Sequence, residues 1–293
     1  MDTSPSRPQP WRSPVSRFRP LLVAAGAAAV ALSLAACAST PGTSPSGAAD
    51  EGYVTPGKLT IATGETAYYP YVIDDKPESG EGFEAAVAYA VAEQLGFDHD
   101  DVEWVRTSFE SAIAPGPKSF DFNIQQYTIT DDRKKAVDFS SPYYQASQAV
   151  VAIKGGKADG VDSIAGLKDL LLGAMAGSTS ATTIDEAIAP NVAPQLYNSN
   201  EDAVAALKAG QFDAIVLDLP TAYYVATAEI DNSFIVGELP AAGVPDQWGL
   251  LLAKDSPLTA KVTAAVDAIR ENGTLAEITD KWLGSGQGVP LLK

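Results

Sequence analysis

Residues 128–144 read TITDDRKKAVDFSSPYY, and they are the most informative part of this 293-residue chain. They follow Phe122–Gln125, which reads as a β-strand. The Thr and Asp residues that open the segment favour a turn, so we expect the strand to end there. Beyond the segment, Ala149–Ile153 is an apolar, β-branched run. We expect this run to be a strand that crosses from one domain to a second.

Short β-rich runs alternate with helical stretches on both sides of this segment. The other expected strands are Lys58–Ala62, Val102–Val105, Leu171–Met175, Ala214–Leu217 and Gly249–Ala253. The expected helices are Phe83–Leu95, a stretch from about Ala181, Ala203–Ala209, a stretch after Pro220, Leu258–Asn272 and Leu275–Leu283. The first of these helices has apolar side chains at four-residue spacing and ends at a glycine. Alternation of this kind predicts an α/β fold with mainly parallel sheets.

The N-terminus has the pattern of a secretory signal. Four arginines precede an apolar run, Leu21–Ala36, which ends at the sequence Leu-Ala-Ala-Cys37. The run is shorter than the roughly 18–20 residues that a membrane-spanning helix needs. Leu-Ala-Ala-Cys resembles the lipobox of bacterial lipoproteins, in which the Cys becomes the lipidated first residue of the mature chain. The alternative is an incidental thiol in a signal peptide that is cleaved a little later. We expect a signal peptide over residues 1–36 and a lipid anchor at Cys37.

Composition limits the partners and the organisation of the mature chain. Residues 37–56 are rich in Ser, Pro, Gly and Ala and predict a flexible tether. The whole chain has a formal net charge of −17, and residues 1–36 carry four Arg and one Asp, so their removal would leave −20. Such a charge argues against binding to nucleic acid. Cys37 is the only cysteine, which excludes an intramolecular disulfide.

Several segments together resemble the family-3 extracellular solute-binding proteins, the polar-amino-acid receptors of ABC transporters. They read GKLTIAT (57–63), YYPY (68–71), GFE (82–84), TITDDRKK (128–135), VDFSSPYY (137–144), RENGT (270–274) and KWLG (281–284), in family order. The chain departs from the family pattern in two places. Ala86 replaces the usual second acid of the helix that GFE opens, and the sequence APGP at 114–117 interrupts the helix after Phe109. We expect that helix to be short.

The resemblance implies a type II periplasmic-binding-protein fold, with two α/β lobes joined by two hinge strands. Residues 57–147 and 248–293 would form lobe 1, and residues 148–247 would form lobe 2 with the hinge strands. It also implies a substrate-binding component of an ABC importer, which closes around its ligand on the extracytoplasmic face and delivers it to a permease. With the anchor expected at Cys37, we expect this component to be a lipid-anchored monomer.

An amino-acid ligand brings a carboxylate and an ammonium group, and both are costly to bury without partners. The resemblance assigns the carboxylate to Arg133, whose planar guanidinium matches two carboxylate oxygens, and to the helix N-terminus near Thr179. It assigns the ammonium group to Asp218, helped by Thr128 and by a backbone carbonyl near Gln126.

From the residues alone, each of these assignments has an ordinary alternative. Arg133 also fits a solvent-exposed basic trio with Lys134 and Lys135. Asp218 also fits a helix N-cap before Pro220.

A second group of residues bears on the ligand side chain. Tyr68 and Phe109 match the aromatic walls of the family, although core packing is the alternative for both. Glu65 matches an acid of the basic-amino-acid receptors, and Gln125 and Gln126 replace smaller residues. An apolar ligand would leave these polar groups unpaired, at a cost of about 1–3 kcal/mol for each group. We therefore predict a basic or amide amino acid rather than a branched-chain one.

Other chemistries find little support in the sequence. The turn Gly177–Ser180 has Ser178 where a phosphate-binding loop would need Lys, which argues against a nucleotide. His99 is the only histidine and lies in an acidic loop, so we expect neither a metal site nor a cofactor. The competing functions are a periplasmic dehydratase-like enzyme on the same fold and the delivery of ligand to a sensor. Arg133 and Asp218 suit a zwitterion better than acid–base chemistry, and we expect no enzymatic activity.

Overall fold

The computed structural model describes residues 52–241, 246–284 and 288–293. The expected signal peptide, Cys37 and most of the expected tether lie outside these ranges. Within the described ranges, no helix has the length and apolar character that a membrane crossing requires.

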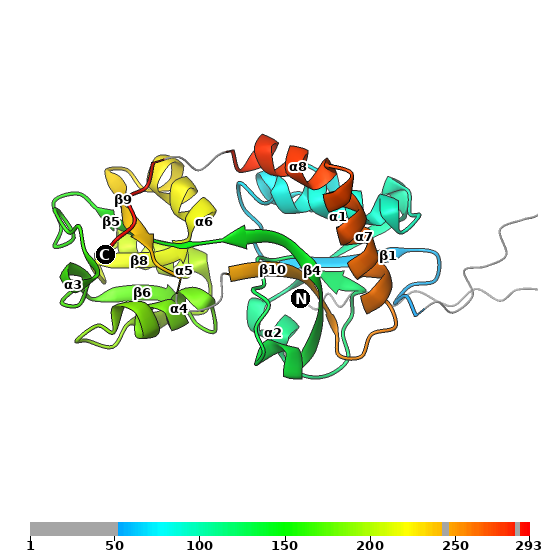
Figure 1. Cartoon of the computed structure of the whole chain (residues 1–293), viewed down its shortest axis with the longest axis horizontal. Helices are drawn as coiled ribbons and strands as arrows, with labels where there is room; N and C mark the ends of the chain where they lie inside the picture. The colour runs from blue at the N-terminus through cyan, green and yellow to red at the C-terminus, as the bar shows by residue number, and fades with distance from the viewer. Residues whose placement is uncertain (1–51, 242–245, 285–287) are drawn as a thin grey trace, which may run out of the picture. The chain divides into compact units, whose positions relative to one another are not determined.

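The first lobe is built on a five-stranded sheet in the order β2-β1-β3-β10-β4. Figure 1 labels β1, β10 and β4 of this sheet. Its strands are β1 (Leu59–Gly64), β2 (Val102–Thr107), β3 (Phe122–Asn123), β4 (Val137–Ala146) and β10 (Asp246–Ala253). Strand β1 runs parallel to β2 and β3, whereas β10 runs antiparallel to β3 and β4. Every residue of β1 is buried, which explains why it has no polar face in the sequence.

Helices α1 (Phe83–Gln94), α7 (Thr259–Glu271) and α8 (Thr274–Trp282) pack against one another in this lobe. The four-residue spacing of Phe83, Val87 and Val91 places all three side chains in the core of the sheet. Helix α2 (Phe109–Ile113) is short, as predicted. Ser108 caps its start by accepting a hydrogen bond from the Ser111 N–H at 3.3 Å.

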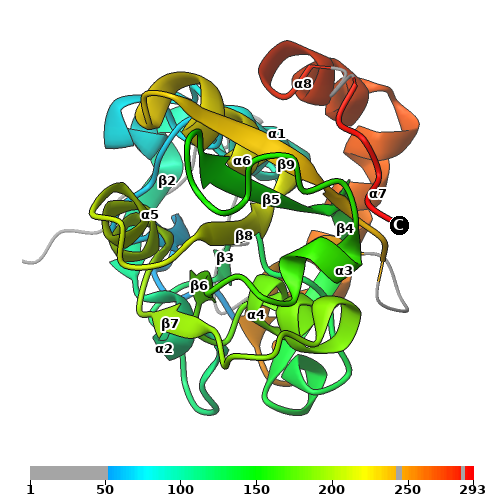
Figure 2. The same ribbon diagram turned by 90° about the vertical axis from the view of Figure 1, so that its left-hand side faces the viewer.

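The second lobe contains another five-stranded sheet, in the order β7-β6-β8-β5-β9 (Figure 2). Its strands are β5 (Gln148–Ile153), β6 (Leu172–Met175), β7 (Gln195–Tyr197), β8 (Ala214–Asp218) and β9 (Ser233–Leu239). Its helices are α3 (Ile164–Leu167), α4 (Thr179–Thr183), α5 (Asn200–Lys208) and α6 (Leu219–Tyr224). Helix α4 continues into a π-helical turn at Ile184–Ile188, and α6 into another at Val225–Glu229.

Strand β5 shows why the central strands are continuous apolar runs. Val150 and Ala152 face one hydrophobic cluster of the second lobe, while Ala149 and Val151 face the other. Both faces of the sheet are therefore covered, and neither side of the strand is left to polar residues.

The chain passes directly from β4 into β5, and only Ser147 separates the two strands (Figure 1). This is where the sequence predicted a crossing between domains. The expectation of mainly parallel sheets is wrong, because each sheet combines two parallel and two antiparallel strand pairings. Two of the four antiparallel pairings involve β4 and β9, which were not among the expected strands. The other two join strands that were expected, β3 with β10 and β5 with β8, whose relative direction the sequence did not reveal.

The C-terminal residues return to the second lobe. The Glu238 N–H donates to the Pro290 carbonyl at 2.8 Å, and the Leu292 N–H donates to the Glu238 carbonyl at 2.9 Å. Leu292 is buried in the core of that lobe, over Gly237, where an added Cβ would lie 2.5 Å from its side chain. The expectation that all of residues 248–293 belong to lobe 1 is therefore wrong for residues 288–293. Leu292 packs into the core beside β9 instead, while Leu291 is exposed.

Candidate ligand-binding site

A cavity of about 450 Å³ lies between loops that come from both sheets. The first lobe contributes residues 63–68, 107–109 and 125–126 together with Tyr71 and Glu84. The second lobe contributes Met175 and residues 198–202. Five of the predicted site residues therefore meet here, namely Glu65, Tyr68, Phe109, Gln125 and Gln126. The volume lies in the range that is typical of small-molecule sites.

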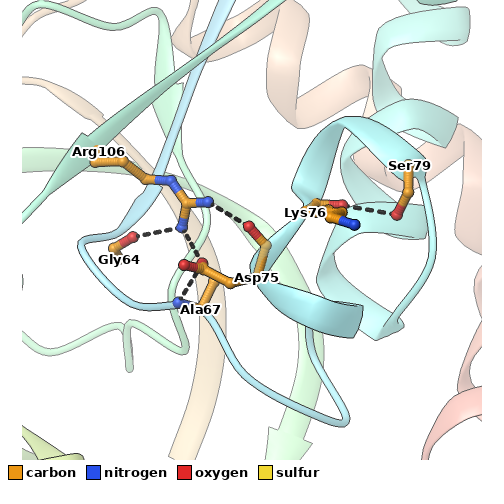
Figure 3. A network of polar contacts seen from close by, with 6 residues as sticks. All are labelled: Gly64, Ala67, Asp75, Lys76, Ser79 and Arg106. Carbon is orange, nitrogen blue, oxygen red and sulfur yellow. Dashed lines mark hydrogen bonds and ion pairs between the residues drawn. The ribbon is translucent and has the colours of Figure 1, made fainter.

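The loop that carries Glu65 and Tyr68 is held by an ion pair (Figure 3). Arg106 Nη1 lies 2.6 Å from Asp75 Oδ1 and donates to the Gly64 carbonyl at 2.9 Å. The same Asp75 oxygen accepts from the Ala67 N–H at 2.9 Å. One end of the loop is thus bonded to the guanidinium directly and the other end through the Asp75 carboxylate, which fixes the position of this wall of the cavity.

Tyr68 joins the two lobes as well as lining the cavity. Its hydroxyl accepts a hydrogen bond from Asn200 Nδ2 at 3.1 Å, and its ring packs edge-on against Tyr71 at 5.8 Å between centroids. The Tyr71 hydroxyl in turn lies 2.9 Å from the Thr221 hydroxyl of the second lobe. Burial and the nearby Glu201 charge raise the pKa of Tyr68, so its phenol stays protonated.

Gln126 is engaged with a buried acid that the sequence analysis did not include. Its backbone N–H donates to Glu84 Oε1 at 2.8 Å, and its side-chain amide donates to the other Glu84 oxygen. The Tyr143 hydroxyl also donates to Glu84. Burial nevertheless raises the pKa of Glu84 to about 7. Glu84 belongs to the GFE motif, so its position was visible in the sequence although its role was not.

Arg133 is buried, with 9% of its surface exposed. Its Nη1 donates to the Thr128 carbonyl at 2.8 Å, and its Nη2 donates to the Gly177 carbonyl of the second lobe at 2.9 Å. Its guanidinium carbon lies 5.4 Å from the centre of the Phe109 ring, at the cavity. The neighbouring Lys134 and Lys135 are exposed and pair with Asp131 and Asp132. The trio suggested by the residues alone is therefore divided, and only Arg133 points inward.

Thr128 and Thr179 face each other from the two lobes, with their hydroxyls 3.4 Å apart. Thr179 is the first residue of α4, which Ser178 caps by accepting from the Ala181 N–H at 3.1 Å. Ser178 therefore caps the helix, while the Thr179 hydroxyl is directed at the other lobe.

Asp218 ends β8 and shares a hydrogen-bond partner with a second acid. Gln148 Nε2 donates to Asp218 Oδ1 and to Asp246 Oδ2, each at 2.6 Å. The Ser180 hydroxyl donates to Gln148 Oε1 at 2.7 Å and thereby orients the amide. Burial and the neighbouring Asp246 charge raise the pKa of Asp218 to about 8, and burial raises that of Asp246 as well. Neither Gln148 nor Asp246 was among the predicted site residues.

The predicted residues therefore form two connected groups. Glu65, Tyr68, Phe109, Gln125 and Gln126 line the cavity, whereas Thr128, Arg133, Thr179 and Asp218 do not. The second group, which we call the clamp, lies at the junction of the lobes and meets the cavity where Arg133 covers Phe109.

The cavity has an acidic lining. Glu65, Glu84, Glu201 and Asp202 all contribute to it, and no Lys or Arg does so among the described residues. No group of three or more His, Cys, Asp or Glu residues that could hold a metal ion occurs in the described ranges. His99 stacks on Tyr89 with 4.0 Å between ring centroids, away from this lining.

The chain was compared with known proteins. Residues 59–285 match the model of the bacterial extracellular solute-binding proteins, family 3. The L-arginine-binding protein of Pseudomonas aeruginosa is 31% identical over 225 residues, which cover 74% of this chain and 85% of that protein. The glutamine-binding protein GlnH of an ABC transporter in Bacillus subtilis is 31% identical over 212 residues, covering 71% and 75%.

The solved structures include an ancestral arginine-binding protein bound to glutamine. It superimposes with a TM-score of 0.67 at 33% identity, over 79% of this chain and all of that one. The strand order, the crossing at Ser147 and the family match agree with one another. The chain belongs to the bacterial extracellular solute-binding proteins of family 3.

Proposed function

We propose that this chain is the lipid-anchored receptor of an ABC importer for an amino acid with a cationic side chain. The observation that carries the proposal is the lining of the cavity, in which four acidic residues occur without a basic one among the described residues. A guanidinium or ammonium group would bring a charge of the opposite sign into this acidic lining, whereas a neutral amide would not.

The clamp would hold the head group of the ligand. Arg133 is buried and its guanidinium donates to the carbonyl oxygens of Thr128 and Gly177, so a ligand carboxylate would add an oppositely charged partner at hydrogen-bonding distance. Asp218 would receive the ammonium group. The cation would favour the ionised carboxylate and lower the raised pKa of Asp218.

The relatives support an amino acid but differ in its side chain. One is named for arginine and another for glutamine. The four acids of this cavity favour the arginine type. The relatives are named as binding proteins, and we accordingly propose a receptor without turnover. An assay with prephenate and arogenate tests that part, because product formation would indicate a dehydratase.

The membrane anchor is part of the same proposal and rests on the sequence around Cys37. Mass spectrometry of the chain from a membrane fraction would detect a diacylated Cys37 as the new N-terminus. A Cys37→Ala variant that stayed in the membrane fraction would refute the anchor without affecting the ligand.

The central experiment is calorimetric titration of the full chain, purified in detergent, with arginine, lysine, glutamine and leucine. We expect tight binding of arginine or lysine, weaker binding of glutamine and none of leucine. Tight leucine binding together with no response to arginine and lysine would overturn the proposal.

A further inference from the structure

The four acids that line the cavity are not equivalent. Glu84 already accepts hydrogen bonds from Gln126 and Tyr143. Glu65 and Asp202 are exposed to solvent, which screens their charge. Glu201 differs from all three, because its Oε1 is buried and has no hydrogen-bond partner among the described residues.

An unpartnered carboxylate oxygen in such a position carries a cost. Removing it from water without a replacement donor disfavours the ionised form. Burial is the largest influence on the pKa of Glu201 and raises it, although contacts of the carboxyl group with its own backbone N–H and with Ser199 act in the opposite direction. The cost persists in the unliganded chain unless something else supplies a donor. The cavity that Glu201 lines provides the space for that donor.

The structural roles that Glu201 could fill are held by its neighbours. Ser199 caps α5 by accepting from the Asp202 N–H at 3.1 Å. Asn200 makes the contact with the Tyr68 hydroxyl. Asp202 supplies an exposed acidic side chain to the same first turn, where the helix dipole favours negative charge. Helix α5 therefore has its capping residue and its interlobe contact without the Glu201 carboxylate.

We propose that Glu201 is the specificity residue that the second lobe contributes, and that its buried carboxylate accepts hydrogen bonds from the cationic end of the ligand side chain. Glu65 faces the same cavity from the first lobe, so the cation would lie between acids from both lobes. The contact exists only when the two lobes enclose the ligand, which makes a cationic side chain a condition for full closure. This inference rests on the proposed function and adds to it a residue and a reason for selectivity.

Burial decides which of the two acids contributes more. A charge pair in a desolvated position is screened much less than one at the surface. Glu201 is half-buried with a fully buried oxygen, while Glu65 is exposed. Glu201 is therefore the stronger determinant.

Arginine and citrulline provide a matched pair of probes, because citrulline has nearly the same shape but no side-chain charge. Both are titrated into the full chain and into the Glu201→Gln variant by calorimetry. We expect the variant to bind arginine about tenfold to a hundredfold more weakly, the range for a hydrogen bond to a charged group. Citrulline affinity should be nearly unchanged, because the variant keeps the size of the side chain and a hydrogen-bonding group.

Three further variants distinguish a direct contact between Glu201 and the ligand cation from a general effect of negative charge on binding. Asp202→Asn removes a charge from the same helix turn at an exposed position, and Glu93→Gln removes one from the exposed surface of α1. Both should weaken arginine binding less than Glu201→Gln does. Glu201→Asp keeps the charge on a shorter side chain and should retain more arginine affinity than Glu201→Gln. It also serves as the measured variant if the glutamine variant does not fold, which thermal unfolding of the ligand-free chains checks.

The outcomes distinguish this inference from the proposed function. Arginine binding by the native chain with an unchanged affinity in Glu201→Gln would overturn the role of Glu201 and leave the receptor proposal standing. Equal losses for arginine and citrulline, or an equal loss in Asp202→Asn, would also overturn it. A native chain that binds neither arginine nor lysine would overturn both.

Discussion

The clamp and the cavity differ in whether their charged side chains already have protein hydrogen-bond partners. In the clamp, Arg133 donates to two carbonyl oxygens and Asp218 accepts from Gln148, so each group already has protein partners. In the cavity, Glu65 is exposed and one oxygen of Glu201 is unpartnered. A ligand must therefore exchange contacts in the clamp but can add contacts in the cavity.

This difference suggests that the clamp binds the head group of the ligand and that the cavity selects its side chain. Exchange of one hydrogen bond for another gains little unless opposite charges meet, so the clamp favours a zwitterionic head group that brings both charges. That requirement is common to all amino acids. The cavity adds a requirement that only some side chains meet, and selectivity follows from it.

Removal of the Arg133 side chain should cause the largest loss of ligand affinity. Arg133→Ala would leave a ligand carboxylate buried without its cation, a cost of about 3–5 kcal/mol for a broken buried pair. We expect a loss of at least about a hundredfold in affinity for every amino acid that the native chain binds. Calorimetry measures it, and Lys134→Ala, at an exposed ion pair, is the control. Retained affinity in Arg133→Ala would show that the carboxylate lies elsewhere.

The second-largest expected effect is a dependence of ligand affinity on pH, which arises from Asp218. Its pKa is about 8 without ligand, and a bound ammonium group should lower it. Between the lowered value and about 8, binding releases a proton, so affinity should rise from pH 6 to pH 8 and then level off. The raised pKa of Asp246 acts in the same direction if the ligand cation also reaches it.

Calorimetry in buffers of different ionisation enthalpy detects the released proton directly. Asp218→Asn should weaken binding by about tenfold or more and reduce the proton release, while the exposed Asp185→Asn should do neither. An affinity that falls as pH rises from 6 to 8 would contradict the assignment of Asp218 to the ammonium group.

The smallest effect should come from Glu65. An exposed charge contributes about 0–1 kcal/mol to a pair, so Glu65→Gln should weaken arginine binding by a few-fold at most. The loss should shrink at high salt, whereas the loss in Glu201→Gln should persist. Titrations at low and high ionic strength make the comparison. A larger loss for Glu65 than for Glu201 would reverse our ranking of the two acids.

The sequence predicted the strands and helices that have two apolar faces or one clearly apolar face. Strands β1, β5 and β8 and helix α1 are of this kind, and all were anticipated. Strand β4 was not, because it contains Pro142 and pairs with β10 through register shifts near Gly249. Its burial pattern does not alternate, so no periodic signal was present.

The site was predictable only in part, for a different reason. Arg133 was found through the resemblance, since its neighbours in sequence are surface lysines. Gln148 and Asp246 are the first residues of β5 and β10, and their meeting near Asp218 depends on long-range strand pairing. Glu201 lies in an ordinary acidic first turn, and only its burial distinguishes it. The ligand roles of the predicted residues stay predictions until they are tested.

The C-terminal segment on β9 has a practical consequence. Tyr53 packs on Phe97 and the Val54 N–H donates to Asp121, both in the first lobe, whereas Leu292 is buried in the second. The first and the last residues that the structure describes thus belong to different lobes. A fluorophore near Val54 and another fused after Lys293 would report changes in lobe separation by energy transfer. The chain could then serve as a reagentless optical probe of its own ligand, without a label placed inside the fold.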